Sequence, residues 1–201
     1  CRVGLGDKDV IDTIQGCAER PVSKKKIVER INLRGGADKL IPPSDLCVYD
    51  TFQNILKCVR NEPGCSVHGS LPCTAWSIIQ NLNFATKGEA FRRRNAREKR
   101  AGRLMLRRFI NIADEALKGG GHVSFEWPCD CSGWLEGDLM TWIMRWDLYV
   151  VDFHGCACGY KHPVSGQPFL KPLRFVTSSP QLAISLSHLQ CQHKRGFVHA
   201  K

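Results

Sequence analysis

The stretch Val67–Ser77 constrains the fold more than any other part of the chain. It begins as a short apolar run, is broken at Pro72 and continues from Ile78 with helix-like spacing. Proline fixes its φ angle and lacks an N–H donor, so the strand ends there. A strand, a tight turn and a helix are typical of open α/β sheets, where ligands bind beyond the carboxyl ends of the strands. We therefore predict an α/β fold with Cys73 at a strand end.

Cys73 has two interpretations. The N-terminus of a helix stabilises a thiolate, which is the nucleophilic form of cysteine. A free cysteine is also a small apolar residue that is often buried, and this chain contains eleven cysteines. The sequence leaves a nucleophile and a core thiol open at this position.

A second strand that ends in a turn is expected over His122–Pro128, after Gly119–Gly121. It carries Glu126. If this strand neighbours the one before Cys73, a thiol and a carboxyl group reach one crevice. The alternative is that Glu126 is an ordinary ion-pair partner of one of the many arginines.

These segments resemble a known family. Pro72-Cys73-Thr74-Ala75-Trp76-Ser77 resembles the Pro-Cys-x-x-x-Ser motif of DNA cytosine-C5 methyltransferases. Phe125-Glu126-Trp127-Pro128 is similar to their Glu-Asn-Val or Glu-Asn-Pro motif, with Trp127 in place of Asn. Residues 156–160 and 171–179 resemble the C-terminal part of methyltransferase-like domains in phages and retroelement polyproteins. The resemblance covers about residues 46–201.

The resemblance implies a Rossmann-like, methyltransferase-type sheet with flanking helices. Residues 46–201 are expected to form this domain, with residues 1–45 as a helical segment or appendage. The glycine-rich loop that binds the methyl donor is not visible, since Gly4-x-Gly6 does not follow a convincing strand. The sheet is therefore expected to be incomplete at its N-terminus or degenerate, and the chain to be part of a longer protein.

The resemblance also implies a reaction. Cys73 would attack C6 of cytosine, while Glu126, with a raised pKa, would contact N3 and the exocyclic amine. S-adenosylmethionine is the expected methyl donor, with Asp50 and Pro72 assigned to its binding. The side chains expected to bind nucleic acid are Ser77, Arg92, Arg93, Arg94, Arg97, Lys171 and Arg174.

Two other functions stay open. One is a catalytically inactive nucleic-acid-binding domain of mobile-element origin that contains a structural zinc site. The other is a thiol hydrolase that pairs Cys73 with His154 or His68, for which the sequence offers no recognisable third member or oxyanion motif.

The charge of the chain favours a polyanionic partner such as nucleic acid, and the resemblance implies that this partner is DNA. The formal net charge is +10 and the isoelectric point is about 9.2. One long helix is expected from Phe91 to Lys118, basic in its first part and amphipathic in its second. The basic part is either a solvated surface or a phosphate-contacting helix.

A Cys- and His-rich tail predicts a metal site. Soft thiolate and imidazole ligands in tetrahedral sets of four are typical of zinc. The alternative is that one cysteine belongs to the core and the histidines are on the surface. The candidate ligands are Cys156, Cys158, Cys191, His193 and His199.

The cysteine content indicates the compartment. An odd number of cysteines cannot pair completely, and a chain with 43% hydrophobic residues does not need a disulfide scaffold. We therefore expect reduced thiols and an intracellular protein, nuclear or cytoplasmic. No run of eighteen apolar residues occurs, so no transmembrane helix is expected.

The remaining elements are expected from periodicity and turn signals. Helices are predicted over 7–15, 22–32, 52–59 and 180–189, with another started by Asp138, and a helix or turn over 76–82. A buried strand is predicted over 148–153, and further strands over 46–49, 65–71 and 174–177.

Overall fold

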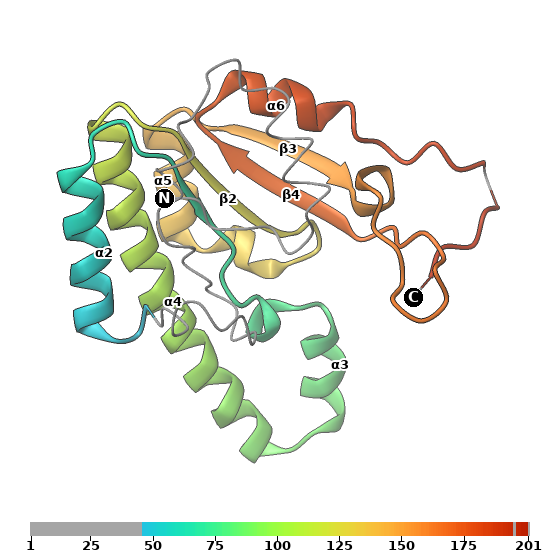
Figure 1. Ribbon diagram of the computed structural model, residues 1–201. Coiled ribbons are helices and arrows are strands. Elements are labelled where there is room, and N and C mark those ends of the chain that lie inside the picture. The colour runs from blue at the N-terminus through green and yellow to red at the C-terminus, as the bar shows by residue number, and fades with distance from the viewer. Residues whose placement is uncertain (1–45, 195, 201) are drawn as a thin grey trace.

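The computed structural model describes residues 46–194 and 196–200 (Figure 1). Segment 1–45, with the helices expected over 7–15 and 22–32, lies outside the described residues. The described part is α/β, as predicted. Its elements are α2 (Tyr49–Asn61), β1 (Val67–Gly69), η2 (Thr74–Trp76), α3 (Ile79–Thr86), α4 (Glu89–Lys118), β2 (Val123–Pro128), η3 (Ser132–Leu135), α5 (Gly137–Arg145), β3 (Tyr149–His154), η4 (Gly155–Cys158), β4 (Pro172–Thr177) and α6 (Pro180–Ser187).

The four strands form one mixed sheet in the order β1-β2-β4-β3. β1 and β2 are parallel neighbours, with Val67 opposite Val123 and Gly69 opposite Phe125. α4 makes the crossover between them, as expected for parallel strands. β4 is antiparallel to both of its neighbours.

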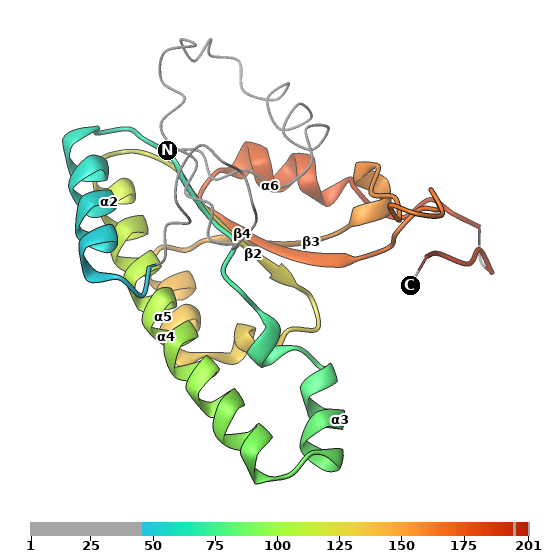
Figure 2. The same ribbon diagram turned by 60° about the horizontal axis from the view of Figure 1, so that its bottom comes forward.

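Helices cover both faces of the sheet (Figure 2). α2, α4 and α5 lie on one face, where the larger hydrophobic core includes Phe109, Phe125 and Trp142. α6 lies on the other face, over a smaller cluster that includes Phe175 and Leu186. Because side chains of a strand alternate between the two faces, successive residues of β2 belong to different layers.

The long helix predicted from Phe91 is confirmed, and it begins at Glu89. Its second half is buried at helical spacing, through residues such as Leu106, Phe109 and Ala113. Its first half extends beyond the sheet and forms a hairpin with α3 (Figure 1). Gly102 of α4 allows η2 to pack closely on this helix, because a Cβ atom there would overlap the indole of Trp76.

The strand predicted over Leu46–Tyr49 is wrong. Residues 46–48 form a turn and a bend, and α2 begins at Tyr49, so Asp50 lies in the first helical turn instead of at a strand end. The residues that α2 buries recur at helical spacing. Before this helix, the carbonyl of Leu46 accepts a 2.6 Å hydrogen bond from Arg108 Nη1. A four-residue apolar run was too short to distinguish a strand from a buried turn.

Three further expectations are corrected. β1 is confined to Val67–Gly69, because the chain leaves the sheet before Pro72. The strand predicted as buried over 148–153 is β3, an edge strand whose first two residues are exposed. Helix α5 has Glu136 as its N-cap residue, with Asp138 in its first turn.

The strands predicted over 122–128 and 174–177 are confirmed as β2 and β4. The helix predicted over 180–189 is α6. Pro180 is its first residue, a position that tolerates proline because the N–H there has no partner within the helix. Ser179 is the N-cap residue, and its Oγ accepts a hydrogen bond from the N–H of Leu182.

Candidate functional site

The strand before Cys73 and the strand that carries Glu126 are neighbours in the sheet. β1 and β2 run parallel, so the turn that contains Cys73 and the turn after Pro128 leave the same edge of the sheet. A hydrogen bond of 2.7 Å from Trp127 Nε1 to the carbonyl of Leu71 fixes the start of the first turn. Trp127 is almost fully buried, so it is a core residue at the position where the methyltransferase motif has Asn.

The segment after Cys73 is held against α4. Cys73 is the N-cap residue of the short helix η2. Asn95 of α4 donates a 3.2 Å hydrogen bond to the carbonyl of Ala75, and Trp76 Nε1 donates a 2.7 Å bond to Glu136. Ser77 ends η2, where its N–H donates to the carbonyl of Thr74. These contacts give the turn a fixed shape.

The thiol of Cys73 lies against another thiol. Cys73 is half-buried and packs on the core between the sheet and α4. It is hydrogen-bonded to Cys131, which follows β2, and this contact together with burial raises the pKa of Cys131. The pair therefore brings the two turns together on the α4 side of the sheet.

Glu126 lies on the opposite face. It stands directly across from Phe175 in the sheet, on the α6 side. Ser70 Oγ donates a 2.7 Å hydrogen bond to its carboxylate. Side-chain alternation along β2 thus places this carboxylate on the face away from the core that contacts Cys73.

His68 belongs to the same buried polar group as Glu126. Its Nδ1 lies 2.8 Å from Ser124 Oγ, and its ring stacks on Phe175 at 5.4 Å. Burial lowers the pKa of His68, and the nearby Glu126 carboxylate opposes this shift. His68 therefore contacts Ser124 on the α6 side, and the structure does not pair it with Cys73.

These polar residues were missed as a group from the sequence. The signal was present, because His68 and Ser70 alternate along β1 while Ser124 and Glu126 alternate along β2. Polar residues at every second position of two parallel strands predict a polar strip on one face of a sheet.

The residues assigned to the methyl donor come from two different segments. Asp50 lies in the first turn of α2, which packs against α4. Pro72 is exposed in the turn after β1. Their assignment to the methyl donor stays a prediction.

The basic residues fall into two groups. Arg92, Arg93, Arg94 and Arg97 lie exposed on the projecting half of α4. Arg93 pairs with Glu89 at 3.2 Å and Arg94 with Glu98 at 3.5 Å, both across one helical turn. Exposed pairs of this kind are weak, so these arginines remain able to exchange partners.

Lys171 lies directly before β4 and Arg174 lies on it, where the first residues of β4 pair with the last residues of β2. Lys171 lies over the ring of Tyr160. Arg174 makes a bidentate ion pair with Asp152, at 2.7 and 2.8 Å, and it lies over the ring of Trp134. The guanidinium of Arg174 therefore already binds the carboxylate of Asp152. This hydrogen-bonded contact holds the pKa of Asp152 below its usual value.

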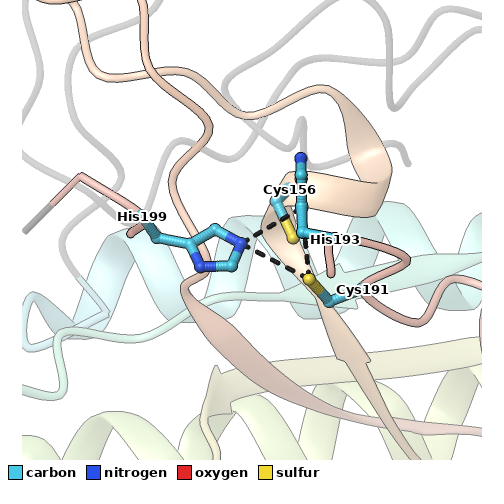
Figure 3. Close-up of side chains that lie close together, drawn as sticks. All are labelled: Cys156, Cys191, His193 and His199. Carbon is cyan, nitrogen blue, oxygen red and sulfur yellow. Dashed lines mark hydrogen bonds between the residues drawn. The ribbon is translucent and has the colours of Figure 1, made fainter. Parts of the chain in front are cut away.

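The structure brings four of the five predicted metal ligands together (Figure 3). The ligand atoms of Cys156, Cys191, His193 and His199 all lie within 4.8 Å of one another. Cys191 Sγ lies 3.2 Å from His193 Nδ1 and 3.3 Å from His199 Nε2, and these two nitrogens are 3.2 Å apart. Donor atoms bound to one tetrahedral zinc ion are separated by roughly 3.3–3.8 Å, given Zn–N and Zn–S bonds of about 2.1 and 2.3 Å. The described cluster could therefore hold a metal ion.

Distant segments position these ligands. Cys156 comes from η4, directly after β3. The N–H of Cys191 donates a 3.1 Å hydrogen bond to His154 Nδ1, which ties the tail to the end of the same strand. The ring of Phe197 stacks on that of His193, with centroids 4.2 Å apart. His154 therefore supports the cluster from outside it.

Cys158 does not join the cluster. It packs against the smaller core cluster that contains Phe153 and Leu186. Burial raises the pKa of Cys158 to about 11. Cys158 is therefore placed as a core thiol, which was the alternative interpretation for one cysteine of the tail.

Comparisons with protein-family models, curated proteins and solved structures found no match to this chain. Within residues 46–194 and 196–200, no helix is both long enough and apolar enough to cross a bilayer.

Proposed function

We propose that this chain is a nucleic-acid-binding domain whose C-terminal segment is held by a zinc ion. The observation that supports binding is a ridge on the projecting half of α4, formed by the exposed residues Arg93, Arg97 and Arg100. Their i, i+4 and i+7 spacing puts them on one side of the helix. Successive members rise about 6 and 4.5 Å along the axis, so the three guanidinium groups form a continuous row of positive charge.

The proposed zinc ion has a structural role. Its four ligands would all come from the protein, and a closed set of this kind leaves no position for a substrate. Zinc held by Cys156, Cys191, His193 and His199 would connect the end of β3 to residues 191–199. This part of the chain contains little regular secondary structure, so a metal ion would supply the cross-links that a hydrophobic core does not.

Salt-dependent binding tests the proposal. Fluorescence anisotropy with a labelled 20-base-pair duplex should give an affinity that falls linearly with salt on a log–log plot. The double variant R97A/R100A should reduce the slope by about 2, since each lost phosphate contact contributes roughly 0.9. The variant K57A/R60A, which removes two charges from α2, should keep the wild-type slope. Equal slopes for all three proteins would contradict the assignment to α4.

Cytosine methylation is the second candidate. The observation that favours it is the parallel pairing of β1 and β2, which places the Cys73 turn and Glu126 on adjacent strands. In this proposal Cys73 bonds to C6 of the base and Glu126 holds a proton near N3. Because the two side chains belong to opposite faces of the sheet, the Cys73 turn would have to rearrange when the base binds. Covalent trapping at Cys73 separates this candidate from the first.

A further inference from the structure

The α3–α4 hairpin has an apolar side as well as a charged one. No charged residue occurs from Ile78 to Thr86. Ile79 and Leu82, one helical turn apart on α3, are 64% and 67% exposed. Gln80 faces inward instead and donates a 2.8 Å hydrogen bond to the carbonyl of Thr74. The side of α3 that faces away from α4 is therefore an exposed apolar surface.

Aromatic rings and cations meet where the two helices join. Phe84 of α3 contacts Phe91 of α4 edge to face, with centroids 5.5 Å apart. Lys87 Nζ and Arg94 Cζ lie 5.4 and 5.5 Å from the centroid of the Phe91 ring. Both rings are only half-buried. Exposed cation–π contacts are weak, so a ligand that stacks on the ring and offers an anion to the cation can replace them.

These two surfaces restrict the kind of nucleic acid that fits. A duplex presents phosphates to its surroundings and keeps its base faces stacked inside, so it satisfies the basic ridge alone. A single strand offers base faces and phosphates together, and such strands are bound by aromatic and apolar side chains beside a basic track. Between Glu89 and Arg103, α4 has seven basic and two acidic residues, which gives the charge complementarity for that strand.

We propose that the α3–α4 hairpin binds single-stranded nucleic acid, with unpaired bases on Phe91 and the outer face of α3 and phosphates on the basic residues of α4. This inference rests on the proposed nucleic-acid binding and specifies its ligand. Base stacking on one aromatic ring contributes enough to change affinity about fivefold or more. The stacking part of the affinity should also persist at salt concentrations that weaken the phosphate contacts.

The test compares a labelled 20-nucleotide thymidine strand with a 20-base-pair duplex, at matched salt, by fluorescence anisotropy. The wild-type protein should bind the single strand at least about fivefold more tightly. F91L keeps an apolar side chain without an aromatic face, and I79Q/L82Q changes exposed positions only. Each variant should lose most of the single-strand preference and keep duplex affinity. M144Q, at an exposed apolar position on α5, is the matched control and should behave as wild type.

The outcomes are distinguishable. Equal affinity for both ligands, or a single-strand preference that survives F91L and I79Q/L82Q, overturns the stacking inference and leaves the binding proposal intact. Failure to bind either ligand at low salt overturns the proposed function itself. Thermal unfolding of each variant, monitored by circular dichroism, confirms that a loss of affinity is not a loss of fold.

Discussion

Trp76 packs closely against Gly102, at a point where a Cβ atom on the helix would overlap its indole. Gly102 lies inside α4, where glycine costs about 1 kcal/mol relative to alanine. The close packing of η2 on α4 offsets this cost.

Substitution of this glycine should therefore destabilise the protein. G102A should lower the free energy of unfolding by about 1–2 kcal/mol, because overpacking outweighs the gain in helix propensity. Urea denaturation followed by tryptophan fluorescence measures the change. The control is G137A in the first turn of α5, where a Cβ atom would meet nothing within 4 Å; it should stay within about 0.5 kcal/mol of wild type. A G102A protein as stable as wild type would show that Trp76 can move at little cost.

Substitution of Cys191 and substitution of Cys158 should affect metal binding differently. The wild-type protein should hold one zinc ion per chain, measured by native mass spectrometry. C191S should lose the metal, because Cys191 lies next to both histidine nitrogens. C158A should keep it, since Cys158 packs against the smaller core. Loss of zinc from C158A with retention by C191S would contradict the ligand assignment.

Chelation extends the same prediction. Removal of zinc should release residues 191–200 to rapid amide hydrogen exchange, while β2 and α4 keep their protection, because the larger core does not involve the cluster. Unfolding of the whole sheet on chelation would show that the zinc site supports more of the fold than its contacts indicate.

The Asp152–Arg174 pair predicts a dependence of stability on pH. Arg174 lowers the pKa of Asp152, so the pair stabilises the protein above the unfolded-state value near 3.9, and this contribution is lost as the pH falls through the lower folded-state value. D152N should cost up to about 1 kcal/mol at pH 7, because the pair is partly exposed. The difference from wild type should shrink below about pH 4.

Urea denaturation of both proteins between pH 7 and pH 2.5 measures this convergence. D130N removes a neighbouring exposed carboxylate and serves as the control at each pH. A constant difference between D152N and wild type across the range would mean that the ion pair is not the source of the stabilisation.

Strong periodic signals made much of the fold predictable. α4 was visible because its apolar positions recur over several turns, and β2 because Pro128 and the preceding glycines delimit it. The short segment at Leu46 carried no periodic signal, so its conformation depended on burial and on the bond from Arg108. The sequence also did not predict that β4 lies between β2 and β3 and runs antiparallel to both, because strand order depends on contacts between distant segments.

The candidate sites were predictable as residue sets and less so as geometries. Cys156 and Cys158 are equivalent ligands in the sequence, but η4 is a 3-10 helix, in which residues two apart point in directions that differ by about 120°. One thiol therefore reaches the metal cluster while the other enters the core. Similarly, the adjacency of β1 and β2 was expected, whereas the side of the sheet that Glu126 faces depends on its register with Phe175.

A nucleic-acid-binding domain should bind DNA without a covalent bond, whereas a methyltransferase should form a covalent bond to the base. One experiment tests for both kinds of complex. The protein and its C73A variant are incubated with 5-fluorocytosine DNA and S-adenosylmethionine, then analysed on native and denaturing gels. We predict a salt-sensitive complex on the native gel for both proteins and none after denaturation. A complex that survives denaturation, requires the donor and is absent in C73A would contradict this and establish Cys73 as the nucleophile.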